Sequence, residues 1–247
     1  AMPFLDILFL FAAGFIASVV NAIAGGGTFL TFGAMTLTGV PPIMANATSA
    51  VTQFPGYVTS AIAYRREIRR DFREALAFGA ISVIGALAGS LLLLSLSNPA
   101  FRQIVPWLLV AATTLFAAGP YIRIKGGAER PMGIGGWLAQ FATSIYGGFF
   151  AAGLGIMMLA VLGLFKGGDY HRLNAIKNFA SVLIAAVAII VFWSGGVVAL
   201  LPAAVMIPAS ALGGYAGVWA ARRVPQGITR AVVITVGLGL SWYYFTS

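Results

Sequence analysis

The amino-acid sequence predicts an all-α polytopic membrane protein made of two inverted-topology repeats, each of about five helical segments. Three observations predict this fold: an extreme hydropathy, ten apolar runs that form two sets of five, and loop charges that change places between the sets. The chain of 247 residues is 60% hydrophobic and 9% charged, with a mean hydropathy of +0.95. Such a composition is typical of helical membrane proteins and excludes an ordinary soluble domain.

The apolar runs differ in length in a regular way. A membrane-spanning helix needs ~20 residues, and eight of the runs are long enough. The second run of each set has only about 13 or 12 residues, which is too short at 1.5 Å per residue. We therefore expect broken or re-entrant second segments. The runs cover residues 4–24, 27–39, 43–64, 74–96 and 100–120, then 134–152, 154–165, 173–193, 197–221 and 226–245.

A single shift of 128 residues aligns the two sets without a gap, which indicates an internal repeat. The shift superimposes the glycine break that precedes each short run, an Asn-Ala pair and a GxxxG motif. The aligned pairs are Gly25 with Gly153, Gly27 with Gly155, Asn46 with Asn174, Gly85 with Gly213 and Gly89 with Gly217.

Loop charge gives the orientation of each repeat. Residues 65–73 of the first repeat contain five arginines, whereas the matching loop at 194–196 is uncharged. The next loop reverses the pattern, because 95–98 is uncharged and its counterpart carries Arg222 and Arg223. Positive loops lie in the cytoplasm, so the second repeat is inserted upside down. This predicts repeat one at 1–120, a cytoplasmic linker at 121–133, repeat two at 134–247 and both termini outside.

The glycine breaks predict one part of a binding site. If each short helix starts at its break, the two Gly-rich tips meet near the membrane midplane from opposite faces. Their free N–H groups and the positive ends of the helix dipoles then suit an anion. The alternative is that the glycines only permit tight helix packing. The candidate residues here are Asn21, Gly25, Gly26, Gly27, Gly153 and Gly155.

The third run of each repeat supplies polar side chains at helical spacing. Asn46, Ser49 and Gln53 lie at i, i+3 and i+7, with Thr48 beside them. In the second repeat the same face carries Asn174, Lys177, Asn178 and Ser181. Such groups face the bundle interior or a water-filled path, where Lys177 would act as a point charge on an oxyanion. The alternatives are hydrogen bonds between helices for the polar groups and snorkelling to the membrane surface for Lys177.

Other residue types restrict the chemistry. The chain has no Cys and a single His, His171, so we expect no metal centre, no cofactor and no catalytic residues. No pair of membrane-embedded Asp residues, no GxSG motif and no acidic cluster for Mg²⁺ supports an intramembrane enzyme. His171 is a candidate proton-coupling group.

Two segments resemble the signatures of the sulfite exporter TauE/SafE family. NAIAGGGTFLTF (21–32) followed by GVPPIMANATS (39–49) resembles the first-repeat signature, and DYHRLNAIKN (169–178) resembles the second. The resemblance extends over essentially the whole chain and implies a bacterial inner-membrane carrier of sulfite or organosulfonates. By position it implies roles for Asn21, Gly25–Gly27, Asn46, Thr48, Ser49, Asn174, Lys177 and Asn178.

The predicted function is a secondary transporter that exports small sulfur-containing oxyanions, such as sulfite or a sulfoacetate-like organosulfonate. The repeats would rock against each other around a midplane site. An anion channel or an uptake permease is the alternative, and an intramembrane enzyme is a more distant one. The expected partners are the anion and the lipid bilayer, but no nucleic acid, because the net charge of +9 follows from positive loops. Each GxxxG motif could pack within one chain or in a homodimer.

Overall fold

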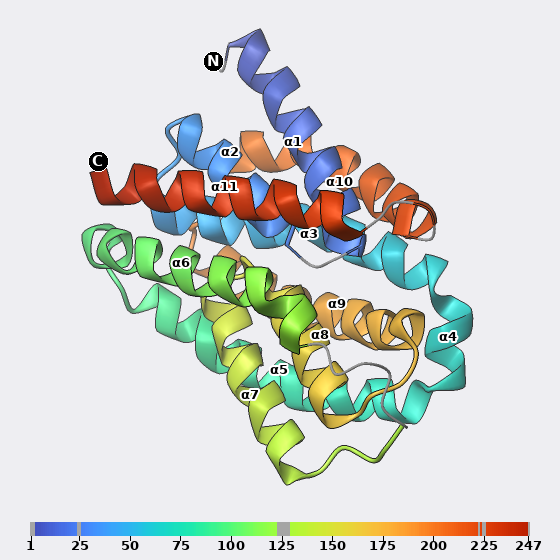
Figure 1. The fold of residues 1–247 in the computed structure, drawn as a ribbon. Coiled ribbons are helices and arrows are strands. Elements are labelled where there is room, and N and C mark those ends of the chain that lie inside the picture. Colours follow the sequence, from blue (N-terminus) through green and yellow to red (C-terminus); the bar gives the residue numbers. More distant parts are fainter. Residues whose placement is uncertain (1–2, 24–25, 123–128, 222, 224–225, 247) are drawn as a thin grey trace.

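The computed structural model describes residues 3–23, 26–122, 129–221, 223 and 226–246 (Figure 1). Every regular element in these ranges is an α-helix. In chain order the helices are α1 (Phe4–Ile23), α2 (Thr28–Leu37), α3 (Pro42–Ala63), α4 (Arg65–Arg70), α5 (Phe72–Leu94), α6 (Asn98–Ile122), α7 (Ile134–Phe149), α8 (Leu154–Phe165), α9 (Tyr170–Ser194), α10 (Leu200–Ala221) and α11 (Gln226–Thr246).

The predicted all-helical membrane fold is confirmed, with differences in detail. Of the described helices, α1, α5, α9 and α10 are both long and apolar enough to cross a membrane, whereas eight spans were expected. Helix α7 has only 16 residues, and α3 carries the polar stripe. The short second segments are confirmed as helices of 10 and 12 residues, about 15 and 18 Å long. Residues 123–128 of the expected linker and Gly25 lie outside the described residues.

Helix packing pairs the two repeats element by element. If α1, α2, α3, α5 and α6 correspond to α7, α8, α9, α10 and α11, the most extensive contacts have counterparts. The contact between α1 and α10 corresponds to the contact between α7 and α5. In the same way, the contact between α2 and α11 corresponds to the contact between α8 and α6. Helices α3 and α9 pack on each other, as do α6 and α11. The two sets of helices therefore make similar packing contacts.

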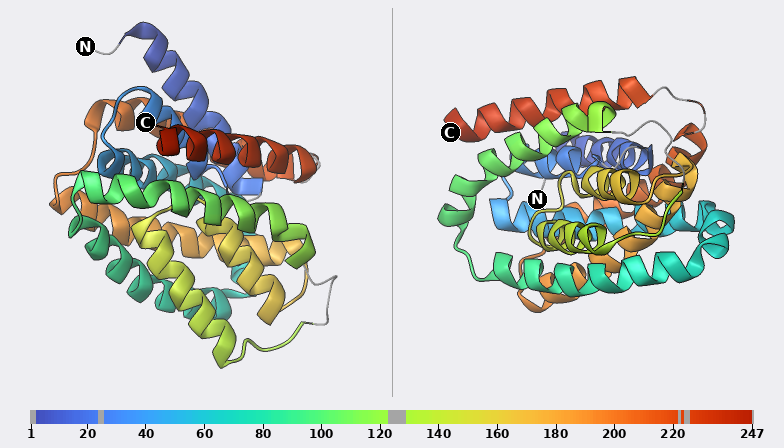
Figure 2. Two further views of the ribbon diagram at one scale, coloured as in Figure 1. Left: turned by 60° about the vertical axis from the view of Figure 1, so that its left-hand side comes forward. Right: turned by 60° about the horizontal axis from the view of Figure 1, so that its bottom comes forward.

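Each packed bundle combines three helices of one repeat with one helix of the other repeat. Helices α1, α2 and α3 pack together, and α10 of the other repeat packs on α1 and α3 to complete a first bundle. Helices α7, α8 and α9 pack with α5 and form a second bundle. In Figure 1 the first bundle lies above the second, and α6 and α11 run side by side across the front; Figure 2 gives two further views. The α3–α9 contact is therefore the seam between the bundles.

Both GxxxG motifs are used inside this chain. A Cβ atom at Gly85 would lie 2.8 Å from the carbonyl oxygen of Phe141 on α7, and one at Gly89 would overlap the carbonyl oxygen of Ile145. In the first bundle a Cβ atom at Gly217 would lie 2.7 Å from the Cβ of Ala22 on α1. Each motif therefore lets two helices of one bundle approach backbone to backbone.

We expect Gly89→Leu to destabilise the second bundle strongly, because the new side chain has no space against α7. Overpacking of this kind costs about 1–3 kcal/mol or more. Thermal unfolding of the purified protein in detergent measures the effect. Gly163→Ala on α8 is the control, because a Cβ atom there has no neighbour within 4 Å. Equal melting temperatures for the two variants would contradict this account of the packing.

Candidate functional site

The centre of the molecule contains the C-terminal end of α1, where the chain breaks before α2. The last four carbonyl groups of a helix have no partner within it and need other donors. Here side chains of α9 supply them. In order, the carbonyl oxygens of Asn21, Ala22 and Ile23 accept hydrogen bonds from Lys177 Nζ (2.9 Å), Asn174 Nδ2 (2.9 Å) and the Tyr170 hydroxyl. These donors lie at i+7, i+4 and i, so one face of α9 caps the broken helix.

The other broken helix, α7, has a matching contact. Asn46 on α3 donates from Nδ2 to the carbonyl oxygen of Phe149, the last residue of α7, at 2.9 Å. Asn46 is the residue that the 128-residue shift aligns with Asn174. Each asparagine of the pair therefore caps the first helix of the other repeat. This cross-capping explains why the two residues occur at equivalent positions.

The segments at which the two short helices begin are in contact. The hydroxyl of Thr28 at the start of α2 donates to the carbonyl oxygen of Ala151, just before α8, at 2.9 Å. Gly153 has a φ of +84°, a left-handed conformation that favours glycine. A Cβ atom at Gly27 would overlap the carbonyl oxygen of Ala17, so this glycine is needed where the chain turns back along α1. The observed role of Gly27 is thus close packing.

The side chain of Asn21 links the break to α3. Its Nδ2 donates to Gln53 Oε1 (3.0 Å) and to the Tyr57 hydroxyl (2.9 Å), and its Oδ1 accepts from the Gly27 N–H at 3.2 Å. Ser18 also donates to Gln53 Oε1, at 3.1 Å. One N–H at the α2 tip is therefore already bound by Asn21 and is not free for a ligand.

Several buried polar groups next to this network have no hydrogen-bond partner among the described residues. They are both amide atoms of Asn178, the hydroxyl of Ser181, Nε2 of Gln53 and Oδ1 of Asn174. Lys177 is 0% exposed, and no ion pair of the described residues includes it. A buried ammonium without a carboxylate is costly unless another anion compensates it. Lys177 and the unpartnered donors beside it on α9 therefore form the best candidate anion site.

Other predicted residues are placed differently. The Thr48 hydroxyl accepts from the backbone N–H of Ala199, just before α10, at 2.8 Å, and Ser49 donates to a carbonyl oxygen of its own helix. Both serve α3 packing and are not hydrogen-bonded to Lys177. Gly26 precedes the first turn of α2, and Gly155 is buried in the first turn of α8.

Two tyrosines that sequence reasoning missed extend the site. Tyr57 follows Gln53 by four residues and so continues the polar face of α3. Tyr64, at the end of α3, hydrogen-bonds through its hydroxyl to Asn174 Nδ2 and to His171 Nδ1, each at 3.2 Å. The helical spacing was the signal that could have identified Tyr57. A hydrogen-bonded chain therefore leads from His171 to the capped end of α1.

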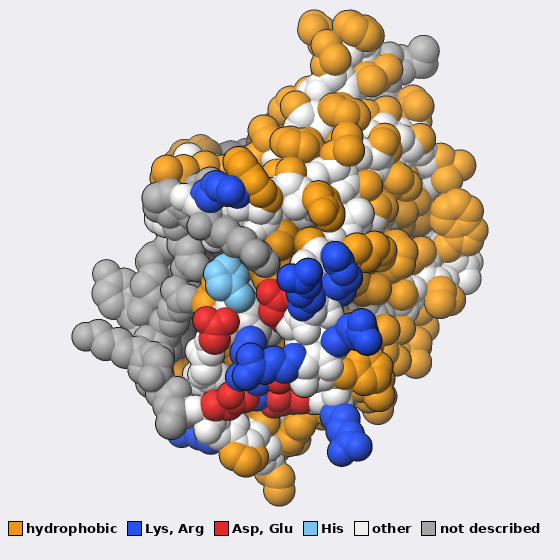
Figure 3. All heavy atoms as spheres, turned by 90° about the vertical axis from the view of Figure 1, so that its right-hand side faces the viewer, with side chains coloured by type: hydrophobic (Ala, Val, Ile, Leu, Met, Phe, Trp, Pro, Cys, Tyr) orange, Lys and Arg blue, Asp and Glu red, His pale blue; other side chains and the backbone are white. Residues whose placement is uncertain are grey.

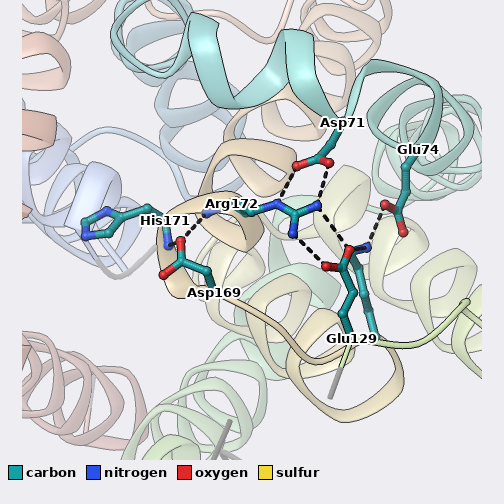
Figure 4. Close-up of polar contacts among 7 residues, drawn as sticks. Asp71, Glu74, Glu129, Asp169, His171 and Arg172 are labelled. Atoms are coloured by element: carbon teal, nitrogen blue, oxygen red, sulfur yellow. Dashed lines mark hydrogen bonds and ion pairs between the residues drawn. The ribbon is translucent and has the colours of Figure 1, made fainter. Parts of the chain in front are cut away.

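Five charged side chains, here called the ionic cluster, gather at one end of the second bundle (Figure 4). Arg172 Nε and Nη2 bind both carboxylate oxygens of Asp71, at 2.8 and 2.5 Å, and its Nη1 lies 2.6 Å from Glu129. Lys166 Nζ lies 2.6 Å from Glu74 and 2.8 Å from Glu129. The cluster ties the start of α5, the segment before α7, the end of α8 and the start of α9 together.

Acid should weaken the ionic cluster. Hydrogen bonds from Arg172 and Lys166 lower the pKa of the Glu129 carboxyl to about 2. Because the unfolded pKa is about 4.3, stabilisation by Glu129 is present above that pH and is lost as the pH falls through the folded pKa. We expect the wild-type protein to have a higher melting temperature than Glu129→Gln at neutral pH. The difference between the two melting temperatures should shrink below about pH 4.3. Thermal unfolding of both proteins in detergent at several pH values measures this difference. A difference that does not change with pH would contradict the prediction.

Comparisons with known proteins find membrane transporters. The model of the sulfite exporter TauE/SafE family matches residues 10–244. A "probable membrane transporter protein" of Haemophilus influenzae is 28% identical over 251 residues, which cover 96% of each chain. The Escherichia coli "probable membrane transporter protein YfcA" is 28% identical over 200 residues, 78% of this chain and 74% of its own. A "probable membrane transporter protein ORF9" of Sinorhizobium is 33% identical over 112 residues, 45% of this chain and 43% of its own.

Proposed function

The chain belongs to the sulfite exporter TauE/SafE family, and from this premise we propose that it is a secondary carrier that exports small sulfur-containing oxyanions such as sulfite or organosulfonates. Its place would be a bacterial inner membrane, with both termini outside and the ionic cluster on the cytoplasmic side. The substrate class and the direction of transport follow the description of the family, and we add the residues that hold the anion.

The observation that carries the proposal is the fully buried amino group of Lys177, which no ion pair of the described residues includes. An ionisable residue inside a membrane bundle marks a substrate or ion pathway by default. Lys177 uses one of its three N–H donors on the carbonyl oxygen of Asn21. The remaining donors, with the amide of Asn178 and the hydroxyl of Ser181 on the same helix face, can bind several oxygens of one small anion. Sulfite and sulfonates each present three oxygens.

The position of the site suits alternating access. The contacts of Lys177 and Asn174 with the end of α1 cross the seam between the two bundles. If the repeats are inverted, movement of one bundle against the other exposes the seam first on one side and then on the other. The moving bodies in this proposal are the two packed bundles and not the two sequence repeats. The ionic cluster lies within the second bundle and keeps it rigid as it moves.

His171 is the proposed coupling group, since Tyr64 links it to Asn174. A histidine ring can accept a proton at one nitrogen and donate one from the other, so His171 can pass a proton along this hydrogen-bonded chain. We expect His171→Gln to retain anion exchange in proteoliposomes but to lose its response to an imposed pH gradient. A response equal to that of wild type would remove His171 from the proposal.

A ligand-stabilisation screen tests the substrate class. Purified protein is melted in the presence of sulfite, sulfoacetate, taurine, sulfate or thiosulfate, with chloride as the control anion. A bound anion at 100 times its Kd stabilises the folded state by about 2.7 kcal/mol. We expect sulfite or a sulfonate to raise the melting temperature more than chloride does. If none of them exceeds chloride, the substrate class is wrong.

A further inference from the structure

A hollow of about 430 Å³ lies on the surface where α4 meets α5, and six consecutive residues, 69–74, line it. It lies apart from the proposed substrate site, because it opens on the outside of the molecule. Three of its residues, Arg69, Arg70 and Arg73, are exposed arginines. Figure 3 shows this face, where blue and red side chains gather within a largely orange surface.

Three arginines but only two carboxylates line the hollow. Its two carboxylates already have partners, since Asp71 binds Arg172 and Glu74 binds Lys166. No ion pair of the described residues includes Arg69, Arg70 or Arg73. Three exposed guanidinium groups therefore line the hollow outside any ion pair of the described residues. Guanidinium groups bind phosphate oxygens in a bidentate manner, so a phosphate is the ligand that this arrangement favours.

Exposed apolar side chains lie in the hollow and on the helices that lead to it. Phe72 lines it and is 49% exposed, and Leu76, one turn further along α5, is 50% exposed. Ile62, near the end of α3, is 52% exposed. In a bilayer these side chains would contact acyl chains, while the arginines would lie at the depth of the headgroups. A ligand that is anionic at one end and apolar at the other fits both features.

We propose that this hollow is a binding site for an anionic phospholipid, with its phosphodiester held by Arg69, Arg70 and Arg73 and an acyl chain along Phe72 and Leu76. The proposal does not depend on the transported substrate. It differs from general attraction to a basic surface, because it assigns binding to the arginines that line the hollow and not to Arg65 and Arg66 on the same helix.

The test measures phosphatidylglycerol binding to the full-length protein in detergent by native mass spectrometry, with phosphatidylcholine as the zwitterionic comparison. Arg69→Gln/Arg70→Gln removes two charges from α4 inside the hollow. Arg65→Gln/Arg66→Gln removes two charges from the same helix outside it. We expect phosphatidylglycerol to bind in preference to phosphatidylcholine. The first variant should weaken that binding about 30-fold, or roughly fivefold per arginine, and the second should weaken it less than about threefold.

Three results would overturn the proposal. Equal losses in the two double variants would mean that only the overall charge matters. Equal binding of phosphatidylglycerol and phosphatidylcholine would mean that the headgroup charge is not recognised. Equal affinity for soluble glycerophosphoglycerol, which has the same headgroup without tails, would make this a site for free phosphodiesters and not for lipid.

Discussion

Lys177→Met is expected to abolish anion transport while the protein still folds. The variant removes a positive charge that the anion would contact directly, and each hydrogen bond to a charged group contributes about 1.5–3 kcal/mol. Loss of one or two such bonds predicts a transport rate lower by about 100-fold or more. The melting temperature should not fall greatly, because methionine fills a similar volume and removes the cost of a buried, unpaired ammonium.

The measurement is the initial rate of labelled sulfite or sulfoacetate uptake into proteoliposomes that contain equal amounts of folded protein. Arg223→Gln is the control, because Arg223 is exposed and lies over the ring of Trp219, far from α9 in sequence. If Lys177→Met transported at the wild-type rate, Lys177 would be only a cap for α1. A large fall in melting temperature together with unchanged transport would support that structural role.

Arg172→Gln is expected to have the largest effect on stability among the variants of the ionic cluster. The substitution leaves the carboxylate of Asp71, whose side chain is 9% exposed, without its bidentate partner. Breaking a fully buried pair costs about 3–5 kcal/mol, and the partial exposure of Arg172 reduces our expectation to about 2 kcal/mol. For a chain of this size that corresponds to a fall in melting temperature of about 4–8 °C.

A double-mutant cycle separates the pair from the arginine alone. Asp71→Asn removes the carboxylate that Arg172→Gln would leave unpaired, so the double variant should recover part of the lost stability. Because the Arg172 side chain donates to Asp71 and Glu129 and not to the residues of the proposed anion site, transport per folded molecule should stay near the wild-type value. If the two single effects simply added, Arg172 and Asp71 would not be energetically coupled.

Helix positions were the most predictable part of the fold. The run 154–165 matches α8 at both ends because glycine precedes it and Lys166, Gly167 and Gly168 follow it. The main difference is α4, because the sequence predicts a charged loop at 65–73. Arginine is a good helix former, and Ile68 in the middle of α4 is buried, so the segment forms a short helix on the surface.

Which elements touch was harder to predict than where they lie. Helical spacing placed Asn174, Lys177 and Asn178 on one face, but not the end of α1 that Asn174 and Lys177 cap. The sequence leaves open whether each GxxxG motif packs within one chain or between two chains. The packing of α5 on α7 and of α10 on α1 shows that both motifs pack within one chain. The ionic cluster was missed because its members are distant in sequence: Arg172 and Asp71 are 101 residues apart.

Solute counterflow tests the central claim most directly. Proteoliposomes are loaded with unlabelled sulfite or sulfoacetate, diluted into a trace of the labelled anion, and the label inside is followed with time. A carrier that alternates around one site exchanges label for unlabelled anion, so the internal label should rise transiently above its equilibrium level. Lys177→Met should show no such rise. A channel lets label equilibrate without an overshoot, and that result with wild-type protein would contradict the proposed mechanism.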